Sequence, residues 1–248
     1  GSGTGHHVNE FSKLSKNVLG VDISHDFLNQ SKKNYPTCKF IKKNILKSLE
    51  FDQNYFSHIK ELGNEKPKNP VLFIKPDTSI LQKNQPFFIP HFSSNIDYEV
   101  EVLIRINRIG KHIQTKFAHK YYDEIGLGID FTARKLQNQL KKNGMPWDKS
   151  KSFDGSALIG DWFPKNEFKD LNSLSFSLKL NDHVVQHGNT SKMLWNIDDL
   201  ISYISQYFTL KIGDIIFTGT PAGVGTVSEG DVLVGHLEDR QAFSVKIK

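Results

Sequence analysis

The chain has 248 residues, 38% hydrophobic and 24% charged, which suits one large globular domain or a medium domain with a small companion and excludes a wholly disordered protein. Its 32 Lys and Arg against 27 Asp and Glu leave a net charge of +5 without the clustered cations of a nucleic-acid-binding face. The single cysteine, Cys38, excludes an intrachain disulfide and a thiolate metal site, and no apolar run reaches membrane-spanning length. We therefore expect a cytoplasmic protein with no nucleic-acid or membrane partner, since Gly1 to Gly5 also lack the pattern of a signal peptide.

The first 53 residues predict a small α/β fragment. Val18 to Asp22 is a short apolar run that ends at an acidic residue, as strands do at the edge of a sheet. A helix is predicted from Ser24 to Lys33, with Pro36 just beyond its end. Lys39 to Ile41 is a second strand candidate.

From Val71 onward the pattern predicts a mainly β domain. Six apolar segments separated by turn residues indicate strands: Val71 to Ile74, Tyr98 to Ile106, Leu174 to Leu180, Ile215 to Phe217, Val232 to Val234 and Phe243 to Ile247. Only two helices are predicted in this part, Phe131 to Asn143 and Ile197 to Phe208. The expected fold class is thus mainly β (α+β) with few helices.

Two glutamates alternate with apolar residues in the strand from Tyr98 to Ile106. Glu99 and Glu101 fall on one face, about 7 Å apart at their Cα atoms, so both side chains can reach one hard cation. The alternative is an amphipathic strand with a solvated polar face.

A second polar cluster surrounds the predicted helix from Phe131. Asp130, Arg134 and Gln137 recur at i, i+4 and i+7, which would place them along one helical face. Alternatively, Asp130 is an N-cap. Lys151 follows in the segment Lys151-Ser152-Phe153-Asp154, where it is a site lysine or an ordinary loop lysine.

Several strings taken together resemble the fumarylacetoacetate hydrolase superfamily, closest to its small acylpyruvase and bacterial hydratase/isomerase members. The strings, in chain order, are Asn54 to Leu62, Tyr98 to Glu101, Gly128 to Arg134, Lys151 to Asp154 and Phe217 to Gly225. The resemblance covers residues 54–248 and implies a mixed β-sandwich roll and a homodimer.

The resemblance implies that Glu99, Glu101 and Asp130 are metal ligands, that Lys151 and Gln137 lie at the substrate, and that Arg134 supports them. Three carboxylates without Cys or His favour Mg²⁺ or Mn²⁺ and leave positions for a chelating 2-oxo acid.

Further upstream, His58 and Glu61 stand one helical turn apart. The resemblance implies a lid dyad in which the histidine activates water and the glutamate orients it, whereas the spacing alone also fits an incidental surface pair. Lys75 falls on another family string and is expected near the substrate. Thr220 lies in a glycine-containing turn whose backbone amides can hold a carboxylate or serve the turn alone.

The expected function is metal-dependent hydrolysis of a carbon–carbon bond in an acylpyruvate-like 2-oxo acid. In this hypothesis His58 deprotonates water, and Lys151 with Gln137 stabilises the developing negative charge. Decarboxylation of 2-oxo acids and isomerisation or hydration of dienoates use the same enolate and stay open.

The segment 1–53 resembles a fragment of a class I methyltransferase that binds S-adenosylmethionine. Gly1 to Gly5 and Val18 to Asp22 correspond to the cofactor loop and the acidic ribose contact. Because 53 residues cannot close such a sheet, we expect no methyl transfer, although a methyltransferase and an inactive fusion or binding protein stay as alternatives. A junction near Asn54 would also remove the strand that begins the hydrolase domain, unless Val18 to Asp22 replaces it.

Overall fold

The computed structural model describes residues 19–22, 25–42 and 48–248, and the chain divides into two compact units, Gly1–Leu46 and Lys47–Lys248. In the first unit, strand β1 (Leu19–Asp22) pairs in parallel with β2 (Lys39–Lys42), and helix α2 (His25–Asn34) connects them. This β-α-β arrangement agrees with the predicted elements of the segment. Val18 and the predicted cofactor loop from Gly1 to Gly5 lie outside the described residues.

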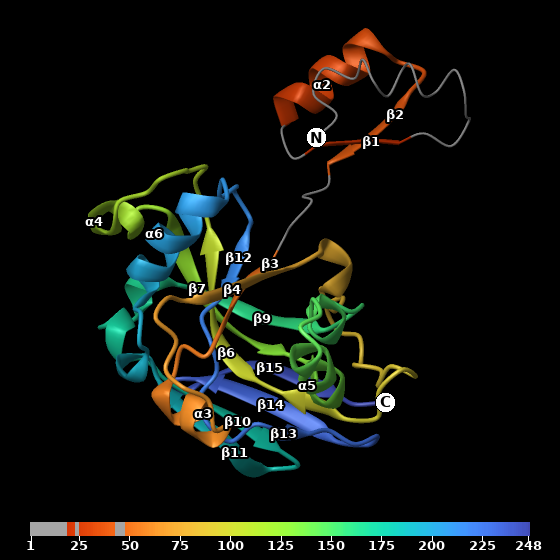
Figure 1. Cartoon of the computed structure of the whole chain (residues 1–248). Helices are drawn as coiled ribbons and strands as arrows, with labels where there is room; N and C mark the ends of the chain where they lie inside the picture. The colour runs from red at the N-terminus through yellow and green to blue at the C-terminus, as the bar shows by residue number, and fades with distance from the viewer. Residues whose placement is uncertain (1–18, 23–24, 43–47) are drawn as a thin grey trace. The chain divides into compact units, whose positions relative to one another are not determined.

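A six-stranded sheet forms the centre of the second unit, in the order β4-β3-β12-β6-β7-β9 (Figure 1). Its strands are β3 (Ser48–Asp52), β4 (Val71–Lys75), β6 (Val100–Ile106), β7 (Tyr122–Asp130), β9 (Ala157–Pro164) and β12 (Ile215–Phe217). All neighbours pair antiparallel except β3 and β12, which are parallel.

Two smaller sheets complete this unit. One has the order β11-β10-β14-β15 and the other β13-β5-β8. Their strands are β5 (Ile96–Tyr98), β8 (Thr132–Ala133), β10 (Ser175–Leu180), β11 (His183–Asn189), β13 (Gly225–Thr226), β14 (Val232–Leu237) and β15 (Arg240–Lys246). The α-helices are α3 (Phe56–Glu61), α4 (Thr115–Ala118), α5 (Arg134–Lys142) and α6 (Ile197–Tyr207). Single 3₁₀ turns span Asp77–Ser79, Asp148–Ser150, Lys165–Glu167, Leu171–Ser173 and Thr190–Lys192.

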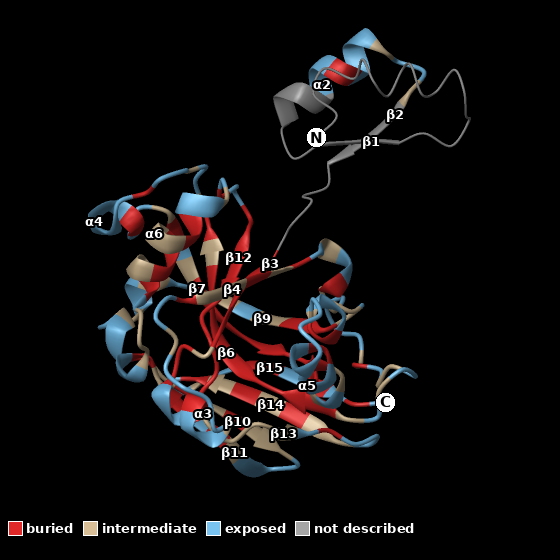
Figure 2. Ribbon diagram, viewed as in Figure 1, coloured by how far each residue is buried: buried red, intermediate tan, exposed pale blue. Residues whose placement is uncertain are grey.

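The alternating apolar residues of these strands form one hydrophobic core. Ile104 on β6, Leu127 on β7, Leu178 on β10 and Ile201 on α6 are completely buried members of this core. Figure 2 shows the buried residues concentrated in the strands and the exposed ones on the helices and loops. The mainly β architecture with few helices confirms the predicted fold class.

The structure corrects the predicted elements on either side of the acidic residues. The strand predicted from Tyr98 to Ile106 is interrupted at Glu99, where the chain passes from the three-stranded sheet into the six-stranded sheet. The helix predicted from Phe131 begins only at Arg134, because Thr132–Ala133 pairs with Ile96–Asp97. Asp130 is therefore the last residue of β7, and its predicted place on a helical face was wrong.

The strand expected to be missing from the hydrolase domain is present. Ser48–Asp52 forms β3, whose Leu49 pairs with Ile74 of β4 and Ile216 of β12. Leu49 and Phe51 contribute to the core, so this unit begins ahead of Asn54. The strand β1 does not replace β3, since it belongs to the other unit.

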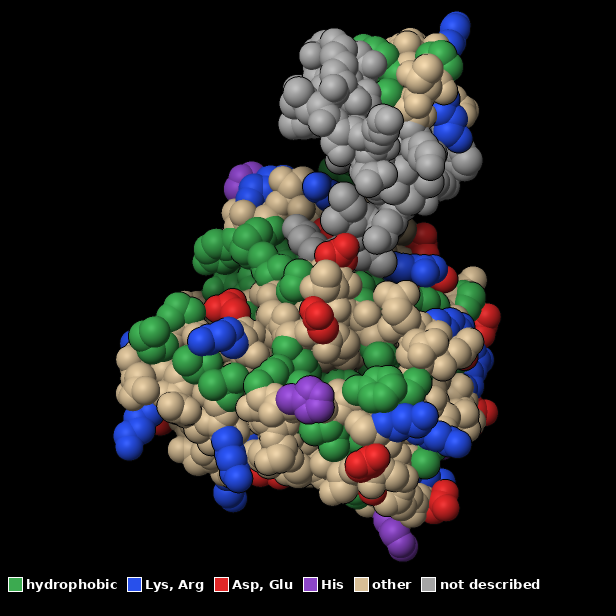
Figure 3. Space-filling model, turned by 90° about the vertical axis from the view of Figure 1, so that its right-hand side faces the viewer, with side chains coloured by type: hydrophobic (Ala, Val, Ile, Leu, Met, Phe, Trp, Pro, Cys, Tyr) green, Lys and Arg blue, Asp and Glu red, His purple; other side chains and the backbone are tan. Residues whose placement is uncertain are grey.

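On the face drawn in Figure 3, Lys and Arg side chains are interspersed with acidic and hydrophobic ones. Among the described residues, no helix combines the length and apolar character that crossing a membrane requires. The expected absence of a nucleic-acid partner stays a prediction.

Candidate active site

Three buried carboxylates meet where β5, β6 and β7 come together. Each of Glu99, Glu101 and Asp130 offers an oxygen, and these oxygens all lie within 4.8 Å of one another. The three residues are only 1–2% exposed. The backbone sets this convergence, because the N–H of Asp130 donates to the carbonyl of Glu99 at 2.9 Å. The solvated strand face considered for Glu99 and Glu101 is thereby excluded.

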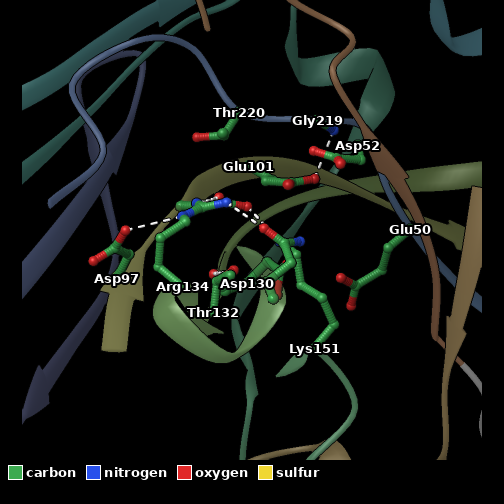
Figure 4. A network of polar contacts seen from close by, with 12 residues as sticks. Glu50, Asp52, Asp97, Glu101, Asp130, Thr132, Arg134, Lys151, Gly219 and Thr220 are labelled. Carbon is green, nitrogen blue, oxygen red and sulfur yellow. Dashed lines mark hydrogen bonds and ion pairs between the residues drawn. The ribbon is translucent and has the colours of Figure 1, made fainter. Parts of the chain in front are cut away.

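Three cationic side chains contact these carboxylates. The Lys151 ammonium lies 2.6 Å from Glu99 Oε2 and also contacts Asp130 Oδ2. Lys75 Nζ lies 2.7 Å from Asp130 Oδ1, while Arg134 contacts Glu99. Figure 4 shows Arg134 reaching toward Asp97 on one side of the group and Glu50 standing on the other. Residues from β3, β4, β5, β7 and α5, together with Glu99 and Lys151, thus supply one connected network of charges.

Burial and neighbouring charges shift the pKa values of these groups in opposite directions. Burial alone would raise the pKa of the Glu99 carboxyl, but Lys151 and Arg134 lower it well below its usual range. Burial and the charges of Asp130 and Glu99 raise the pKa of Glu101 well above its usual value. Burial would lower the pKa of the Lys151 ammonium, but Asp130 and Glu99 raise it. The two carboxylates thus favour the charged form of this lysine.

The loop 218–224 fixes the position of Glu101. The N–H of Gly219 donates to Glu101 Oε2 at 2.6 Å. Gly219 has a φ of +98°, and a Cβ there would lie 2.6 Å from Asn54 Cβ, so the position requires glycine. Thr220 Oγ1 donates to the carbonyl of Val100 and accepts from Gln186 Nε2, both at 2.9 Å. The hydroxyl of Thr220, a predicted substrate contact, thus attaches this loop to β6.

Helix α3 carries the predicted lid dyad. His58 Nδ1 lies 3.3 Å from Glu61 Oε2, and Glu61 Oε1 accepts from the N–H of Gly223 at 2.9 Å. His58 is fully buried, and its Nε2 has no hydrogen-bond partner among the described residues. Glu61 therefore orients the His58 ring through Nδ1, and Nε2 makes no hydrogen bond with the described residues.

Gln137 offers a second uncommitted polar group. Its Oε1 accepts from Arg134 Nη1 at 2.7 Å, whereas its Nε2 is buried without a hydrogen-bond partner in the described part of the chain. This N–H is available to donate a hydrogen bond to a substrate oxygen.

The predicted site residues lie in one region of the structure, in contact with one another or with a common neighbour. Glu99, Glu101 and Asp130 converge, and each of Lys75, Lys151 and Arg134 contacts at least one of them. Gln137 contacts Arg134, His58 contacts Glu61, and Thr220 attaches the loop 218–224 to β6.

Two buried acids of the network were not predicted, Asp97 and Glu50. Asp97 accepts from Arg134 Nε at 3.0 Å, and Glu50 Oε2 lies 3.8 Å from Lys75 Nζ. The apolar residues Leu49 and Phe51 on either side of Glu50 were the available signal, because their alternation indicates a strand.

The donor set suits a hard divalent cation. Three buried carboxylates whose oxygens lie within 4.8 Å of one another supply the oxygen ligands that Mg²⁺ and Mn²⁺ prefer. Lys75, Lys151 and Arg134 pair with Glu99 and Asp130, whereas no ion pair of the described residues reaches Glu101.

Comparison with known proteins agrees with this geometry. Residues 48–246 match the family model described as fumarylacetoacetate (FAA) hydrolase C-terminal. The chain belongs to the fumarylacetoacetate hydrolase family. Residues 1–60 also match a methyltransferase domain model, so the two matches overlap over residues 48–60.

Relatives in the fumarylacetoacetate hydrolase family include two curated proteins. The oxaloacetate tautomerase YcgM of Escherichia coli is 40% identical over 181 residues, covering 73% of this chain and 83% of its own. The mitochondrial oxaloacetate decarboxylase of Dictyostelium discoideum is 41% identical over 188 residues, covering 75% and 86%.

A solved structure of the family is also similar. It is the fumarylpyruvate hydrolase of Pseudomonas aeruginosa in complex with Mn²⁺ and pyruvate, with a TM-score of 0.76 and 28% identity, covering 82% of this chain and 89% of its own. The family is one of enzymes. The Pseudomonas structure contains Mn²⁺, and the acidic triad of the present chain suits a divalent metal as well.

Proposed function

We propose that the unit Lys47–Lys248 is a divalent-metal-dependent tautomerase that interconverts the enol and keto forms of an oxaloacetate-like 2-oxo acid. The observation that carries this proposal is the buried triad of Glu99, Glu101 and Asp130, with His58 held through Glu61 by the same loop, 218–224, that holds Glu101. Enolisation beside a 2-oxo group needs charge stabilisation at oxygen and a base at carbon, and this site offers both. The similarity to an oxaloacetate tautomerase supports the choice of substrate class.

Glu99, Glu101 and Asp130 would hold Mg²⁺ or Mn²⁺. When bound, such an ion supplies Lewis-acid chemistry that orients the 2-oxo acid and draws negative charge toward its enolate oxygen.

His58 is the proposed base. Its Nε2 would accept the proton from the carbon next to the 2-oxo group of the keto form, and the enolate oxygen would take a proton from solvent to give the enol; the reverse reaction releases the oxygen-bound proton and returns one from Nε2 to carbon. Glu61 keeps Nδ1 in place through the 3.3 Å contact, and Gly223 keeps Glu61 in place. The hydrogen bond to Nδ1 thereby selects the tautomer that leaves Nε2 free to accept the proton.

The remaining polar groups would bind the substrate. Gln137 Nε2 is the buried donor without a partner in the described chain and suits a substrate oxygen. Lys151, Lys75 and Arg134 supply positive charge for a dianionic substrate and for the enolate.

A second candidate function is hydrolysis of an acylpyruvate. The similarity to a fumarylpyruvate hydrolase that binds Mn²⁺ and pyruvate favours it, because the same His58 would deprotonate water for attack on the distal carbonyl. Decarboxylation of oxaloacetate, the reaction named for the Dictyostelium relative, starts from the same 2-oxo acid.

An assay panel separates these reactions. The full chain, loaded with Mn²⁺, would be given enol-oxaloacetate, keto-oxaloacetate and acetylpyruvate, with enol absorbance and pyruvate release as readouts. We expect the enol absorbance to decay fastest, without pyruvate release. Faster pyruvate release from acetylpyruvate would replace the tautomerase with the hydrolase, and no turnover by folded, metal-loaded protein would remove the enzyme proposal. The homodimer is a further proposal, which light scattering would test.

A further inference from the structure

The strand β3 contributes a buried carboxylate that the proposed chemistry does not use. Alternation along β3 places Leu49 and Phe51 in the hydrophobic core and turns Glu50 to the opposite face. Glu50 is completely buried, and neither of its carboxylate oxygens has a hydrogen-bond partner among the described residues. A buried ionised carboxylate is costly unless another charge compensates it.

The compensating charge is Lys75. Glu50 lies opposite Phe73 in the β3–β4 register, and Lys75 is two residues farther along the same face of β4. Glu50 Oε2 and Lys75 Nζ are 3.8 Å apart, and both side chains are completely buried. The ammonium of Lys75 already contacts Asp130 Oδ1 at 2.7 Å and the carbonyl and hydroxyl of Ser156. One lysine thus serves two carboxylates.

The surrounding network contains more acids than bases. Its cations are Lys75, Arg134 and Lys151, and its carboxylates are Glu50, Asp97, Glu99, Glu101 and Asp130. With all eight groups ionised, two negative charges are in excess, which is the charge that one divalent cation would balance; Asp52, also drawn in Figure 4, pairs with Lys141 and adds no net charge. Figure 4 shows Glu50 extending from its strand toward the side of the group where Lys151 lies.

We propose that Glu50 is the charge-balancing residue that matches this site to a divalent cation, by supplying Lys75 with a carboxylate other than Asp130. The inference rests on the proposed function, because it concerns the metal that this function uses. A cation held by the triad withdraws negative charge from Asp130, and Glu50 is then the carboxylate that remains beside Lys75. Burial together with the charge of Asp130 raises the pKa of Glu50, as expected for an acid in excess within a closed network.

Calorimetric titration of the full chain with Mn²⁺ tests the proposal. Glu50→Gln keeps the shape and removes the charge, so we expect its dissociation constant to rise about tenfold or more. Glu50→Asp keeps the charge and should stay within about threefold of wild type. Glu124→Gln is the matched control, because Glu124 pairs with Arg105 outside the network. Loss of the Glu124 charge should leave the dissociation constant for Mn²⁺ unchanged.

Thermal unfolding in chelator provides a readout that needs no metal. At alkaline pH, where Glu50 loses its proton, Glu50→Gln removes an excess buried charge, and we expect its melting temperature to exceed that of wild type by about 2 °C or more. A folded Glu50→Gln protein that binds Mn²⁺ within about twofold of wild type, or that melts no higher in chelator at that pH, overturns the inference. Failure of wild type to bind Mn²⁺ would instead remove the proposed function, and the chelator experiment would still decide whether Glu50 carries the excess charge.

Discussion

The charges on the sheets and the dyad on α3 are held in different ways. Asp130 and Lys75 lie at the ends of strands in the six-stranded sheet, and each is buried and ion-paired. His58 and Glu61 belong to a six-residue helix, and Glu61 is attached to the loop 218–224 through the N–H of Gly223. The proposed cation ligands and the proposed base thus lie on different elements that share the loop 218–224, and we expect substitution of one group to leave the other in place.

The largest expected effect comes from removing β3. A chain that begins at Asn54 lacks Leu49 and Phe51, and burial of each such side chain contributes about 1.5–3 kcal/mol of a total stability of about 5–15 kcal/mol. We expect this chain not to fold, whereas a chain that begins at Lys47 should fold. Circular dichroism during heating compares them, and equal cooperative melting of the two would refute the assignment of β3 to this unit.

The next effect concerns the cation. Asp130→Asn removes one charged oxygen ligand while keeping the shape, so Mn²⁺ affinity should fall by about 100-fold or more, since loss of a supporting residue alone costs 10–100-fold. Activity should be lost with it. Asp161→Asn is the control, because Asp161 is exposed and pairs only with Lys83 among the ion pairs of the described chain. Unchanged Mn²⁺ binding by Asp130→Asn would exclude the triad as the metal site.

Substitution of the base should separate the two parts. His58→Gln should lower kcat by about 10²–10⁴-fold and leave Mn²⁺ affinity unchanged, because His58 contributes proton transfer rather than a ligand. Steady-state kinetics and calorimetry on the same preparation check this, with His187→Gln on the surface of β11 as the control. A parallel loss of metal binding would show that the helix and the sheets are not independent.

A smaller effect is expected for the orienting acid. Glu61→Gln can still accept from Gly223 but loses its charge beside His58 Nδ1, so kcat should fall about tenfold, the value of one hydrogen bond to a charged group. Equal kcat for Glu61→Gln and wild type would make Glu61 a packing residue only.

The smallest effect is a pH dependence of stability in the metal-free protein. Burial, with Asp130 beside both groups, raises the pKa of Glu50 and Glu101, so the folded state keeps protons that the unfolded chain releases near pH 4.3. Stability from these groups is present below that pH and is lost as pH rises toward their folded pKa values. The lowered pKa of Glu99 acts in the opposite direction, and only at lower pH.

Melting in chelator should therefore show a lower melting temperature at about pH 8 than at about pH 5, and Mn²⁺ should reduce the difference. A melting temperature that rises over this range without metal would contradict the raised pKa values.

The sequence predicted most of the strands and the identity of the acidic residues, because both depend on local patterns. Ile215 to Phe217 coincides with β12, and Ile197 to Phe208 differs from α6 by one residue. The alternation around Glu99 and Glu101 predicted that the two side chains share one face. The structure agrees, because their carboxylate oxygens lie within 4.8 Å of each other.

Other features depend on pairing between distant segments, which a local pattern does not contain. The late start of α5 follows from the pairing of Thr132–Ala133 with Ile96–Asp97, so periodicity alone extended the helix to Phe131. Strand β3 was missed because residues up to Asp52 resemble a methyltransferase fragment, and Glu50 was missed with it. Strands β7, β9 and β11 were also missed, and glycines within each of them weaken the strand pattern.

The parallel pairing of β3 with β12 has a consequence for biosynthesis. Ser48 pairs with Ile215, so the edge of β3 that faces β12 stays without its partner until about 170 further residues have been synthesised. Contacts this distant in sequence slow folding, because the entropy of closing the long intervening segment is lost before the contact forms. We expect nascent chains to expose β3 for most of their synthesis, and chaperone demand to end when the last quarter of the sequence emerges.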